Sequence, residues 1–251
     1  MVKKCSKKKC QLIRGIKEVK NTCYMDTVLF ALLAIPNKVI KNTLLSRKDT
    51  TTCSNICSKN CSKEVRLREM FRTFLQKIHT DIQEGKWTSS VPQIKSVIKD
   101  CDNYKYALDF SKYVQEDAKD FLEFLISLFA LDNTRLLQLD LCLSKNLFRS
   151  LEKQYNLRES FVIVYINRVC GKGEKNRSIV KYKKTLNTGK RLHLTHIICH
   201  LGQTSVEGHY ICYIMCGDNW YLYDNSKEFI RKIGGKLPDT IYRDGVLFFY
   251  S

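Results

Sequence analysis

A cysteine at the start of an apolar helix is the first residue of the chain with the features of a nucleophile. Residues 21–33 read Asn-Thr-Cys-Tyr-Met-Asp-Thr-Val-Leu-Phe-Ala-Leu-Leu, so a short polar lead-in reaches Cys23 before an apolar run that ends ahead of Pro36. The apolar residues recur at spacings of three and four, which predicts a buried helix with Cys23 at or near its N-terminus. There the unpaired backbone N–H groups and the helix dipole favour a thiolate over a thiol. Cys23 is therefore a candidate nucleophile if a base comes from elsewhere, although one cysteine among twelve is, taken alone, more often a buried structural residue.

A histidine and an aspartate far downstream supply the groups that such a nucleophile needs. His209 follows Gly208 and begins a predicted strand, and the turn at 217–219 leads to a second strand that ends at Asp224. A hairpin around that turn would bring Asp224 back beside His209. A carboxylate in that place fixes the imidazole tautomer and stabilises the imidazolium. The spacing thus favours a Cys23–His209–Asp224 triad, in which the histidine is the base of a cysteine protease.

The other four histidines are expected to have ordinary structural positions. His193, His196 and His200 lie along one predicted strand, where packing in the core or on the sheet surface explains them. His79 falls in a predicted helix and is expected to be solvated.

The elements that must position these residues divide the chain into a helical half and a β half. Helical periodicity fills the N-terminal half, and short apolar runs separated by turn residues follow from Phe161. The predicted helices are one that begins at Cys23, one over 65–82 that Gly85 stops, a shorter one from Pro92 through Ile98, one opened by 115–120 that runs through Phe129, and one over 134–143. The predicted strands span 161–166, 179–182, 192–200, 209–215, 220–223 and 246–250.

This order of elements predicts an α+β domain. A basic tail at 1–14 precedes a helical lobe at about 15–157 and an antiparallel β lobe at about 158–251, and a polar insert at 46–63 interrupts the helical lobe. The two lobes would meet along a cleft, with Cys23 from one lobe and His209 from the other.

Length and composition exclude several classes of protein. With 251 residues, 44% of them hydrophobic and 27% charged, the chain is one large globular domain or two packed lobes. No apolar run approaches the length of a membrane-spanning helix, and the lysine-rich N-terminus lacks the apolar core of a signal peptide. We therefore expect an intracellular protein of the cytoplasm or nucleus, with no membrane partner and with its cysteines mostly as free thiols.

The formal net charge of +18 arises partly from a lysine-rich tail at 3–9 and a second basic cluster over 168–184. Such clusters occur in nuclear import and in nucleic-acid contacts, and they also occur on ordinary solvated surfaces. No zinc finger, helix-turn-helix or aromatic RNA-binding signature is present, so we expect no specific nucleic-acid partner. Charge alone would give only salt-sensitive, unspecific affinity.

Three short motifs follow one another along the chain: Asn-Thr-Cys-Tyr-Met at 21–25, Gln-Glu-Asp-Ala at 115–118 and Gly-His-Tyr at 208–210. In this order they resemble the ubiquitin-specific proteases, and the resemblance covers roughly residues 15–250. The first motif looks like the cysteine box of that family, and the second resembles its Gln-Gln-Asp box. Gly-His-Tyr at 208–210, followed by Trp220 and Asp224, resembles the histidine box. The strands at 161–169 and 246–250 are also similar to strands of the family.

The resemblance implies a papain-like cysteine protease fold with a helical thumb and an antiparallel β palm. It implies a thiol isopeptidase that cleaves after the C-terminal glycine of ubiquitin, with Cys23 as nucleophile, His209 as general base and Asp224 as the orienting residue. The implied substrate-binding residues are Gln115, Asp117, Gly208 and Tyr210.

Asp117 matches the family position that pairs with an arginine of the basic ubiquitin tail. A carboxylate and a guanidinium form a bidentate, charge-assisted contact, which suits that role. A carboxylate is equally suited to the N-terminus of a helix, where the dipole stabilises it.

The chain departs from the family pattern in the zinc-binding fingers. The family usually inserts two Cys-x-x-Cys pairs between the Gln-Gln-Asp box and the palm, whereas this interval holds no such pair and only Cys142, Cys170 and Cys199. We therefore expect the fingers to be reduced or absent, and neither a metal nor a cofactor to be bound. An alternative zinc site, of atypical spacing, would combine Cys53, Cys57 and Cys61 with Cys101 or His79.

A second departure concerns the oxyanion hole. The family has an asparagine five residues before the nucleophile and a glycine three before it, and here those positions are Glu18 and Lys20. A carboxylate that faces a developing oxyanion would oppose catalysis. We expect Glu18 to turn away, paired with Lys17 or Lys20, and to leave Asn21 and the backbone N–H of Cys23 as the donors.

The sequence therefore favours a compact, monomeric deubiquitinase whose partners are ubiquitin and ubiquitinated proteins. Three alternatives remain open: a catalytically weak or inactive ubiquitin-binding relative, a protease for another ubiquitin-like modifier, and a basic nucleic-acid-binding protein. The last of these leaves the cysteine box unexplained.

Overall fold

A computed structural model describes residues 14–19, 21–34, 38–46, 61–89, 116–131, 134–141, 148, 151, 161–170, 174–187, 189–204 and 207–251. Residues 47–60 of the polar insert, the helix predicted from Pro92, and Gln115 lie outside these residues. Cys53, Cys57 and Cys101 of the alternative zinc site lie outside them too.

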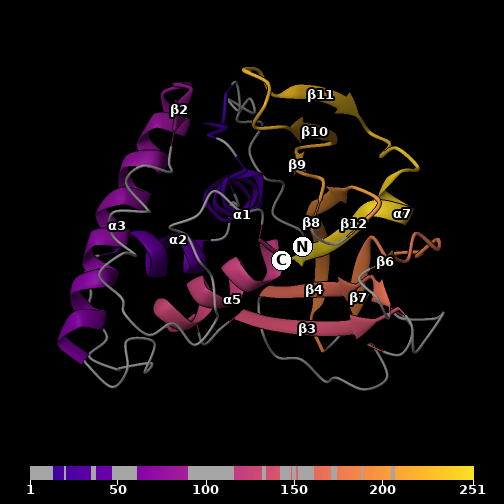
Figure 1. The fold of residues 1–251 in the computed structure, drawn as a ribbon, viewed down its shortest axis with the longest axis horizontal. Coiled ribbons are helices and arrows are strands. Elements are labelled where there is room, and N and C mark those ends of the chain that lie inside the picture. The colour runs from indigo at the N-terminus through magenta and orange to yellow at the C-terminus, as the bar shows by residue number, and fades with distance from the viewer. Residues whose placement is uncertain are drawn as a thin grey trace.

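The helical half is built around α1, Cys23–Ala34, which begins at the candidate nucleophile as the sequence predicts. All of its residues from Cys23 to Leu33 are buried, so the helix is surrounded on every side instead of burying one face. Figure 1 shows α1 between the long helix α3, Cys61–Gln83, and the sheet. The other helices of this half are α2, Lys38–Leu45, and α5, Ala118–Leu128.

Two local features fix the ends and the packing of α3. Gly85 has φ 68° and its N–H bonds the carbonyl of Ile82 at 3.2 Å, which ends the helix where the sequence predicts. Near the other end, the buried guanidinium of Arg68 pairs with Glu64 at 2.9 Å and donates to the carbonyl of Leu128 at 2.7 Å. This last contact joins α3 to the C-terminal end of α5.

The β half forms one eight-stranded sheet with the order β11-β10-β9-β8-β12-β4-β3, and β7 pairs with β8 off this path. All pairings are antiparallel except β3–β4, which is parallel. The strands are β3 Thr134–Asp140, β4 Phe161–Asn167, β7 Thr185–Asn187, β8 Arg191–Leu201, β9 His209–Cys216, β10 Asn219–Tyr223, β11 Arg231–Gly234 and β12 Gly245–Tyr250.

Several smaller elements lie outside the large sheet. β1, Ile16–Lys17, runs parallel to β2, Thr88–Ser89, so the lead-in to α1 pairs with the segment after α3. β5, Val169–Cys170, and β6, Glu174–Lys175, form a short antiparallel ribbon. The short helix α7, Ile241–Asp244, precedes β12.

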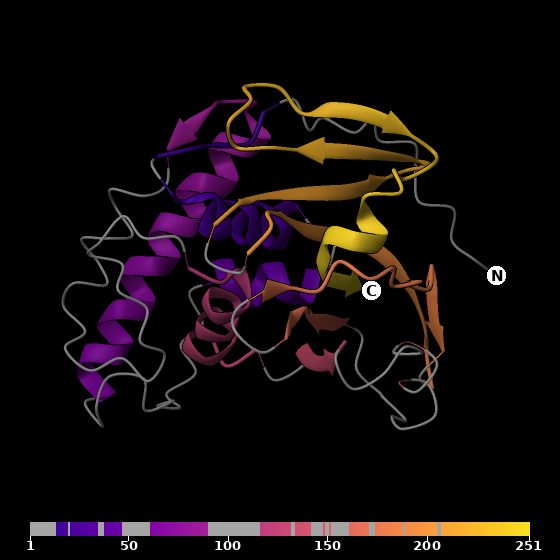
Figure 2. The same ribbon diagram turned by 45° about the vertical axis from the view of Figure 1, so that its right-hand side comes forward.

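Apolar residues cover both faces of the sheet. On the helix side, Phe30 of α1 stacks on Tyr223 of β10 with ring centroids 4.0 Å apart, and Tyr24 meets Phe121 of α5 edge-on at 6.1 Å. On the opposite side a second cluster includes Phe148, whose ring lies 5.5 Å from Phe248. In Figure 2 the helices again gather at one side of the molecule and the strands at the other. This two-lobed α+β arrangement is the one predicted from the sequence.

The helix predicted over 134–143 is wrong, because residues 134–140 form strand β3. Leu136 packs against the helix-side cluster, whereas its neighbour Leu137 belongs to the cluster on the opposite face. Adjacent leucines fit a helix and a two-sided buried strand alike, so the pairing of β3 with β4 decides the structure. The sheet thus includes a strand from the part of the chain that was assigned to the helical lobe.

The strand predicted over 179–182 is also wrong, since the strand β7 follows only at Thr185–Asn187. Ile179 is 57% exposed, and Val180 donates its N–H to the carbonyl of Tyr242 at 2.8 Å instead of joining a ladder. The apolar pair Ile179–Val180, which suggested a strand, therefore lies outside the sheet, and Val180 contacts α7.

None of the described helices is long and apolar enough to cross a membrane. Cys23, Cys199 and Cys212 are buried free thiols, as expected. Cys216 is disulfide-bonded, which is an exception to the expectation of free thiols.

Candidate active site

The structure brings three predicted side chains together at the N-terminus of α1. Cys23 is the first residue of that helix, is a free thiol and is 2% exposed. His209 is the first residue of β9, and Asp224 directly follows β10, the partner of β9 in a hairpin. Nε2 of His209 lies 2.8 Å from Oδ1 of Asp224, and the imidazole also hydrogen-bonds the Cys23 side chain.

The charges of these groups favour an imidazolium next to the thiol. Hydrogen bonds with Asp224 and then with Cys23 raise the pKa of His209 to about 10, against the opposing effect of burial. Burial alone would raise the pKa of Asp224, but hydrogen bonds from His209 and Ser226 outweigh it and lower this pKa to about 2. The arrangement therefore holds a carboxylate, an imidazolium and a sulfur nucleophile in one hydrogen-bonded series.

Gly208 allows the chain to enter β9 beside a buried histidine. It has φ 156°, and a Cβ there would lie 2.5 Å from Nε2 of His200 and 2.5 Å from the carbonyl oxygen of Leu201. No side chain fits in that space without displacing β8. Close packing within the protein therefore accounts for this glycine, and its predicted approach to a substrate backbone stays a prediction.

Tyr210 lies in the core, where it fixes β9 against both its neighbouring strand and α5. Its ring is 3% exposed and packs on His200 with centroids 4.6 Å apart, and its hydroxyl accepts from the N–H of Ala118. Burial, together with nearby Lys175, lowers the pKa of His200 to about 4, so this second histidine is neutral near pH 7. A contact of the Tyr210 side chain with substrate remains a prediction.

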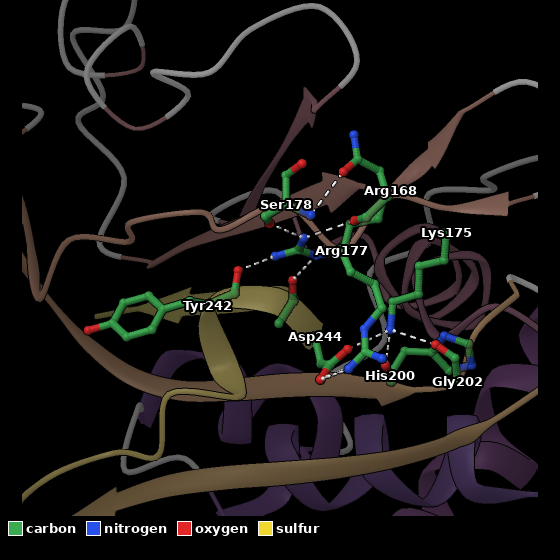
Figure 3. A network of polar contacts seen from close by, with 10 residues as sticks. Arg168, Lys175, Arg177, Ser178, His200, Gly202, Tyr242 and Asp244 are labelled. Carbon is green, nitrogen blue, oxygen red and sulfur yellow. Dashed lines mark hydrogen bonds and ion pairs between the residues drawn. The ribbon is translucent and has the colours of Figure 1, made fainter.

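The basic cluster over 168–184 is partly internal, and its buried members, Arg168 and Lys175, contact α7 and, in the case of Lys175, also the end of β8 (Figure 3). Arg168, whose side chain is 2% exposed, follows β4 and spans the gap to α7 and the 176–178 segment. Its guanidinium donates to the carbonyls of Gly245, Asn176, Ser178 and Tyr242 at 2.9–3.2 Å. Burial lowers its pKa to about 10.

Lys175 extends this network to the loop that leads into His209. Its ammonium, on a side chain that is 2% exposed, pairs with Asp244 at 3.0 Å and also donates to the carbonyls of His200 and Gly202 (Figure 3). Arg177 makes a second ion pair with Asp244 at 3.2 Å. Lys175 and Arg168 are therefore structural cations, and neither belongs to a solvated or nucleic-acid-binding surface.

The lead-in to Cys23 contains both candidate oxyanion residues. Asn21 is exposed and has φ 59°, the left-handed conformation that asparagine tolerates better than most residues. The N–H of Glu18 donates to the carbonyl of Asn225 at 3.0 Å. Lys17, one of the two expected partners of Glu18, instead places its ammonium 5.0 Å from the ring centroid of Trp87. No ion pair links Glu18 to another of the residues that the structure describes.

Asp117 is the N-cap of α5, which is the second of the two roles that the sequence suggested for this carboxylate. It has β-region dihedrals, and its Oδ1 accepts from the N–H of Lys119 at 2.8 Å. The hydroxyl of Tyr165 donates to Oδ2 at 3.4 Å. Burial, which is the largest effect, raises the pKa of Asp117. The pairing of Asp117 with a substrate arginine stays a prediction.

Two buried polar residues next to the candidate triad join the lobes, and the sequence did not reveal them as site residues. Asp26 lies within the apolar run of α1, and Asn225 directly follows Asp224. Both side chains are 0% exposed, and Nδ2 of Asn225 donates to Oδ2 of Asp26 at 2.8 Å. An acidic residue in an otherwise apolar helix was a visible signal for Asp26, but nothing local identifies its partner. Among the described residues, no group of three or more His, Cys, Asp or Glu side chains is placed to hold a metal ion.

A sequence model described as ubiquitin carboxyl-terminal hydrolase matches residues 14–161 and 147–250. These ranges cover most of the chain and include Cys23, His209 and Asp224. The chain belongs to the ubiquitin carboxyl-terminal hydrolase family. No curated protein matches it in sequence.

Solved structures show that this family member has the papain-like fold of the ubiquitin-specific proteases. A chain of the SAGA DUB module of Ubp8, Sgf11, Sus1 and Sgf73 bound to monoubiquitin matches with a TM-score of 0.65 and 16% identity, over 96% of this chain and 69% of that chain. The same module bound to ubiquitin aldehyde matches with a TM-score of 0.62 and 16% identity, over 98% and 70%. A further structure of the Ubp8-Sgf11-Sgf73-Sus1 SAGA DUB module also matches with a TM-score of 0.62 and 16% identity, over 96% of this chain and 68% of that chain. At this identity the likeness establishes the fold.

Proposed function

We propose that the chain is a thiol-dependent deubiquitinase, which hydrolyses the isopeptide or peptide bond after the C-terminal glycine of ubiquitin. The observation that carries the proposal is the hydrogen-bonded series of Cys23, His209 and Asp224 at the N-terminus of α1, in a chain of this hydrolase family. Its fold is shared with modules that are described as bound to ubiquitin, which supports the same substrate here.

In the proposed reaction the Cys23 thiolate attacks the carbonyl carbon of the terminal glycine, and a tetrahedral intermediate forms. The imidazolium of His209 gives its proton to the leaving amine as the C–N bond breaks, which leaves a thioester on Cys23. Neutral His209 then removes a proton from water, whose oxygen attacks the thioester and releases the ubiquitin carboxylate. Asp224 keeps the ring oriented and stabilises its cationic form throughout.

The oxyanion of the intermediate needs donors on the N-terminal side of Cys23. We propose that the first backbone N–H of α1, which is that of Cys23, and the side chain of Asn21, two residues before Cys23, supply them. The backbone N–H of Glu18 is bound to Asn225, and this scheme assigns no role to the carboxylate of Glu18.

Recognition of the basic ubiquitin tail is proposed to involve Asp117, together with Gln115 and the segment Gly208–Tyr210. Asp117 stands at the N-terminus of α5, and this helix is tied to β9 through the contact of Ala118 with Tyr210. A carboxylate here can bind an arginine of the tail while it keeps its bond to the N–H of Lys119, because its two oxygens offer several acceptor positions.

Hydrolysis of a ubiquitin–fluorophore conjugate tests the proposal. The wild-type chain should release the fluorophore, and Cys23→Ala, which suits a helix and should keep the fold, should not. The same conjugate built on other ubiquitin-like modifiers should be cleaved far more slowly. If the conjugate of one of those modifiers were cleaved faster, that modifier and not ubiquitin would be the substrate. Hydrolysis by the Cys23→Ala variant would refute the mechanism.

One observation favours a second candidate, a ubiquitin-binding relative of weak activity. Glu18 occupies the position at which the family has its oxyanion asparagine, and a negative charge there would raise the barrier to acyl transfer. This candidate would be supported if the wild-type chain bound ubiquitin without releasing the fluorophore, and if Glu18→Asn restored fluorophore release.

A further inference from the structure

Asp26 is a buried carboxylate with a bond that crosses between the two lobes. It lies in the first turn of α1, three residues after Cys23, and is 0% exposed. Its Oδ2 accepts from the hydroxyl of Thr22 at 2.7 Å and from Nδ2 of Asn225 at 2.8 Å. The helix dipole favours an acid in a first turn, but a fully buried carboxylate needs hydrogen bonds as well. Asn225 supplies one of them from a position 199 residues away in the sequence.

The hydrogen bond between Asn225 and Asp26 links α1 to the turn that carries Asp224. Its side chain is 0% exposed and faces α1, whereas its neighbour Asp224 contacts His209. The turn itself is closed by the N–H of Lys227, which donates to the carbonyl of Asp224 at 2.9 Å. A movement of Asn225 away from Asp26 therefore moves Asp224, and with it the ring of His209.

The orientation of the Asn225 amide also follows from this contact. Oδ1 of Asn225 is buried and has no partner among the described residues, while Nδ2 faces the carboxylate. The opposite orientation would set an amide oxygen against the oxygens of Asp26, so repulsion excludes it. The bond to Asp26 is therefore kept, although Oδ1 of Asn225 has no partner in the part of the chain that the structure describes.

The same carboxylate fixes the lead-in to the nucleophile. The hydroxyl of Thr22, which donates to Asp26, accepts from the N–H of Val19 at 3.1 Å, and Asn225 holds the N–H of Glu18 through its carbonyl. Asn21, between these anchors, has the uncommon φ of 59°. A non-glycine residue keeps such a conformation when the surrounding contacts determine it.

We propose that Asp26 and Asn225 form a positioning pair that sets Cys23, the Asp224–His209 pair and the Asn21 loop at fixed distances from one another. The proposal rests on the proposed function and deepens it, because it assigns the alignment of the triad to a hydrogen bond between the lobes. Neither residue touches substrate. Their effect is on geometry, to which the rate of a catalysed step is sensitive: a displacement of about 1 Å can reduce it by about 100-fold.

Exchange of the two residues tests the pair. Asn225→Asp places two carboxylates in contact and should lower kcat on the ubiquitin–fluorophore conjugate by about 10- to 100-fold with KM within about twofold. Asp26→Asn keeps an acceptor oxygen for both donors and should stay within about fivefold of wild type. The double exchange, D26N/N225D, restores one donor and one acceptor, and should recover most of the kcat that N225D loses.

A second readout separates positioning from loss of fold. The rate of Cys23 alkylation by iodoacetamide is followed against pH by mass spectrometry of the Cys23 peptide, at a temperature at which each variant is folded by circular dichroism. In N225D alkylation near neutral pH should slow by about tenfold or more, because the imidazolium no longer lies beside the thiol, and the double exchange should restore the wild-type profile. Asn225→Ala, which removes the donor without adding charge, should slow alkylation in the same way and serves if N225D does not fold.

Glu64→Gln is the matched control. It removes the charge of another 0% exposed carboxylate, paired with Arg68 in α3, away from the triad. It should lower stability and leave both kcat and the alkylation profile unchanged. The proposal is overturned if folded N225D and N225A keep the wild-type profile, or if the double exchange fails to recover kcat. A wild-type chain that does not cleave ubiquitin would refute the proposed function alone, since the alkylation profile uses no ubiquitin.

Discussion

Replacement of Asp224 by asparagine separates the charge of this side chain from its geometry. Oδ1 accepts from Nε2 of His209 at 2.8 Å, and from the N–H and the hydroxyl of Ser226 at 3.0 and 2.7 Å. These donors need an acceptor at that point, so the amide of D224N should place its oxygen there and keep the ring orientation. Asp224→Ala removes both the charge and the acceptor.

The size of each effect follows from the strength of these bonds. A hydrogen bond to a charged group contributes about 1.5–3 kcal/mol and a neutral one about 0.5–1.5 kcal/mol, so the charge accounts for about 1–1.5 kcal/mol. That difference corresponds to about one pKa unit of His209, and loss of the whole bond to about one to two units. We therefore expect D224N to keep about a tenth or more of kcat/KM, and D224A to lose about 100-fold.

The assay is kcat/KM on the ubiquitin–fluorophore conjugate over a pH series. Because the folded pKa of His209 is raised to about 10, the imidazolium is present below that pH and is lost above it, which sets the alkaline limb of the profile. This limb should move about one unit toward neutral pH in D224N and further in D224A. Identical limbs in wild type and D224N, or equal rates in the two variants, would show that Asp224 does not act through the charge of His209.

The remaining predictions concern stability, substrate binding and the oxyanion hole. His196 is 0% exposed, and burial lowers its pKa to about 3. As the pH drops below about 6.5, this histidine is protonated in the unfolded chain but stays neutral in the folded chain. The free energy of unfolding therefore decreases as the pH falls from about 6.5 to about 3. His196→Phe should remove up to about 3 kcal/mol of that loss, measured as the difference in urea unfolding between pH 7 and pH 4. Asp117→Asn should keep the helix cap and raise KM, so that kcat/KM falls by an amount equivalent to about 1.5–3 kcal/mol of transition-state stabilisation. Asp117→Ala should in addition lower the free energy of unfolding by about 1 kcal/mol. If Asp117 is only a cap, the asparagine variant will have the wild-type KM. Glu18→Gln should leave kcat within a few-fold and Asn21→Ala should reduce it by about 10²–10³, and the reverse order would make Glu18 the residue that faces the oxyanion.

The positions of Cys23 and His209 could be predicted because local signals mark them. A polar lead-in to an apolar periodic run places Cys23 at the start of α1, and Gly208 before an apolar strand places His209 at the start of β9. A short turn then brings Asp224 into reach, since a hairpin pairs residues at a fixed offset.

The features that depend on distant contacts could not be predicted. Strand β3 was interpreted as a helix because its leucine pair satisfies either period, and only pairing with β4 selects the strand. Lys175 was assigned to a basic surface, although Asp244 and two backbone carbonyls hold it inside the protein. Asp26 is polar within an apolar helix, but its partner Asn225 is brought to it by the tertiary fold. A buried polar residue thus signals that a partner exists without saying which.

Covalent labelling tests the central claim most directly. Ubiquitin with an electrophile at its C-terminus is incubated with the chain, and the modified residue is located among the twelve cysteines by peptide mass spectrometry. We expect one ubiquitin per chain, attached to Cys23, with labelling abolished in Cys23→Ala and strongly slowed in His209→Ala. Attachment to another cysteine, or equal labelling of Cys23→Ala, would contradict the assignment of Cys23 as the nucleophile of a ubiquitin-directed protease.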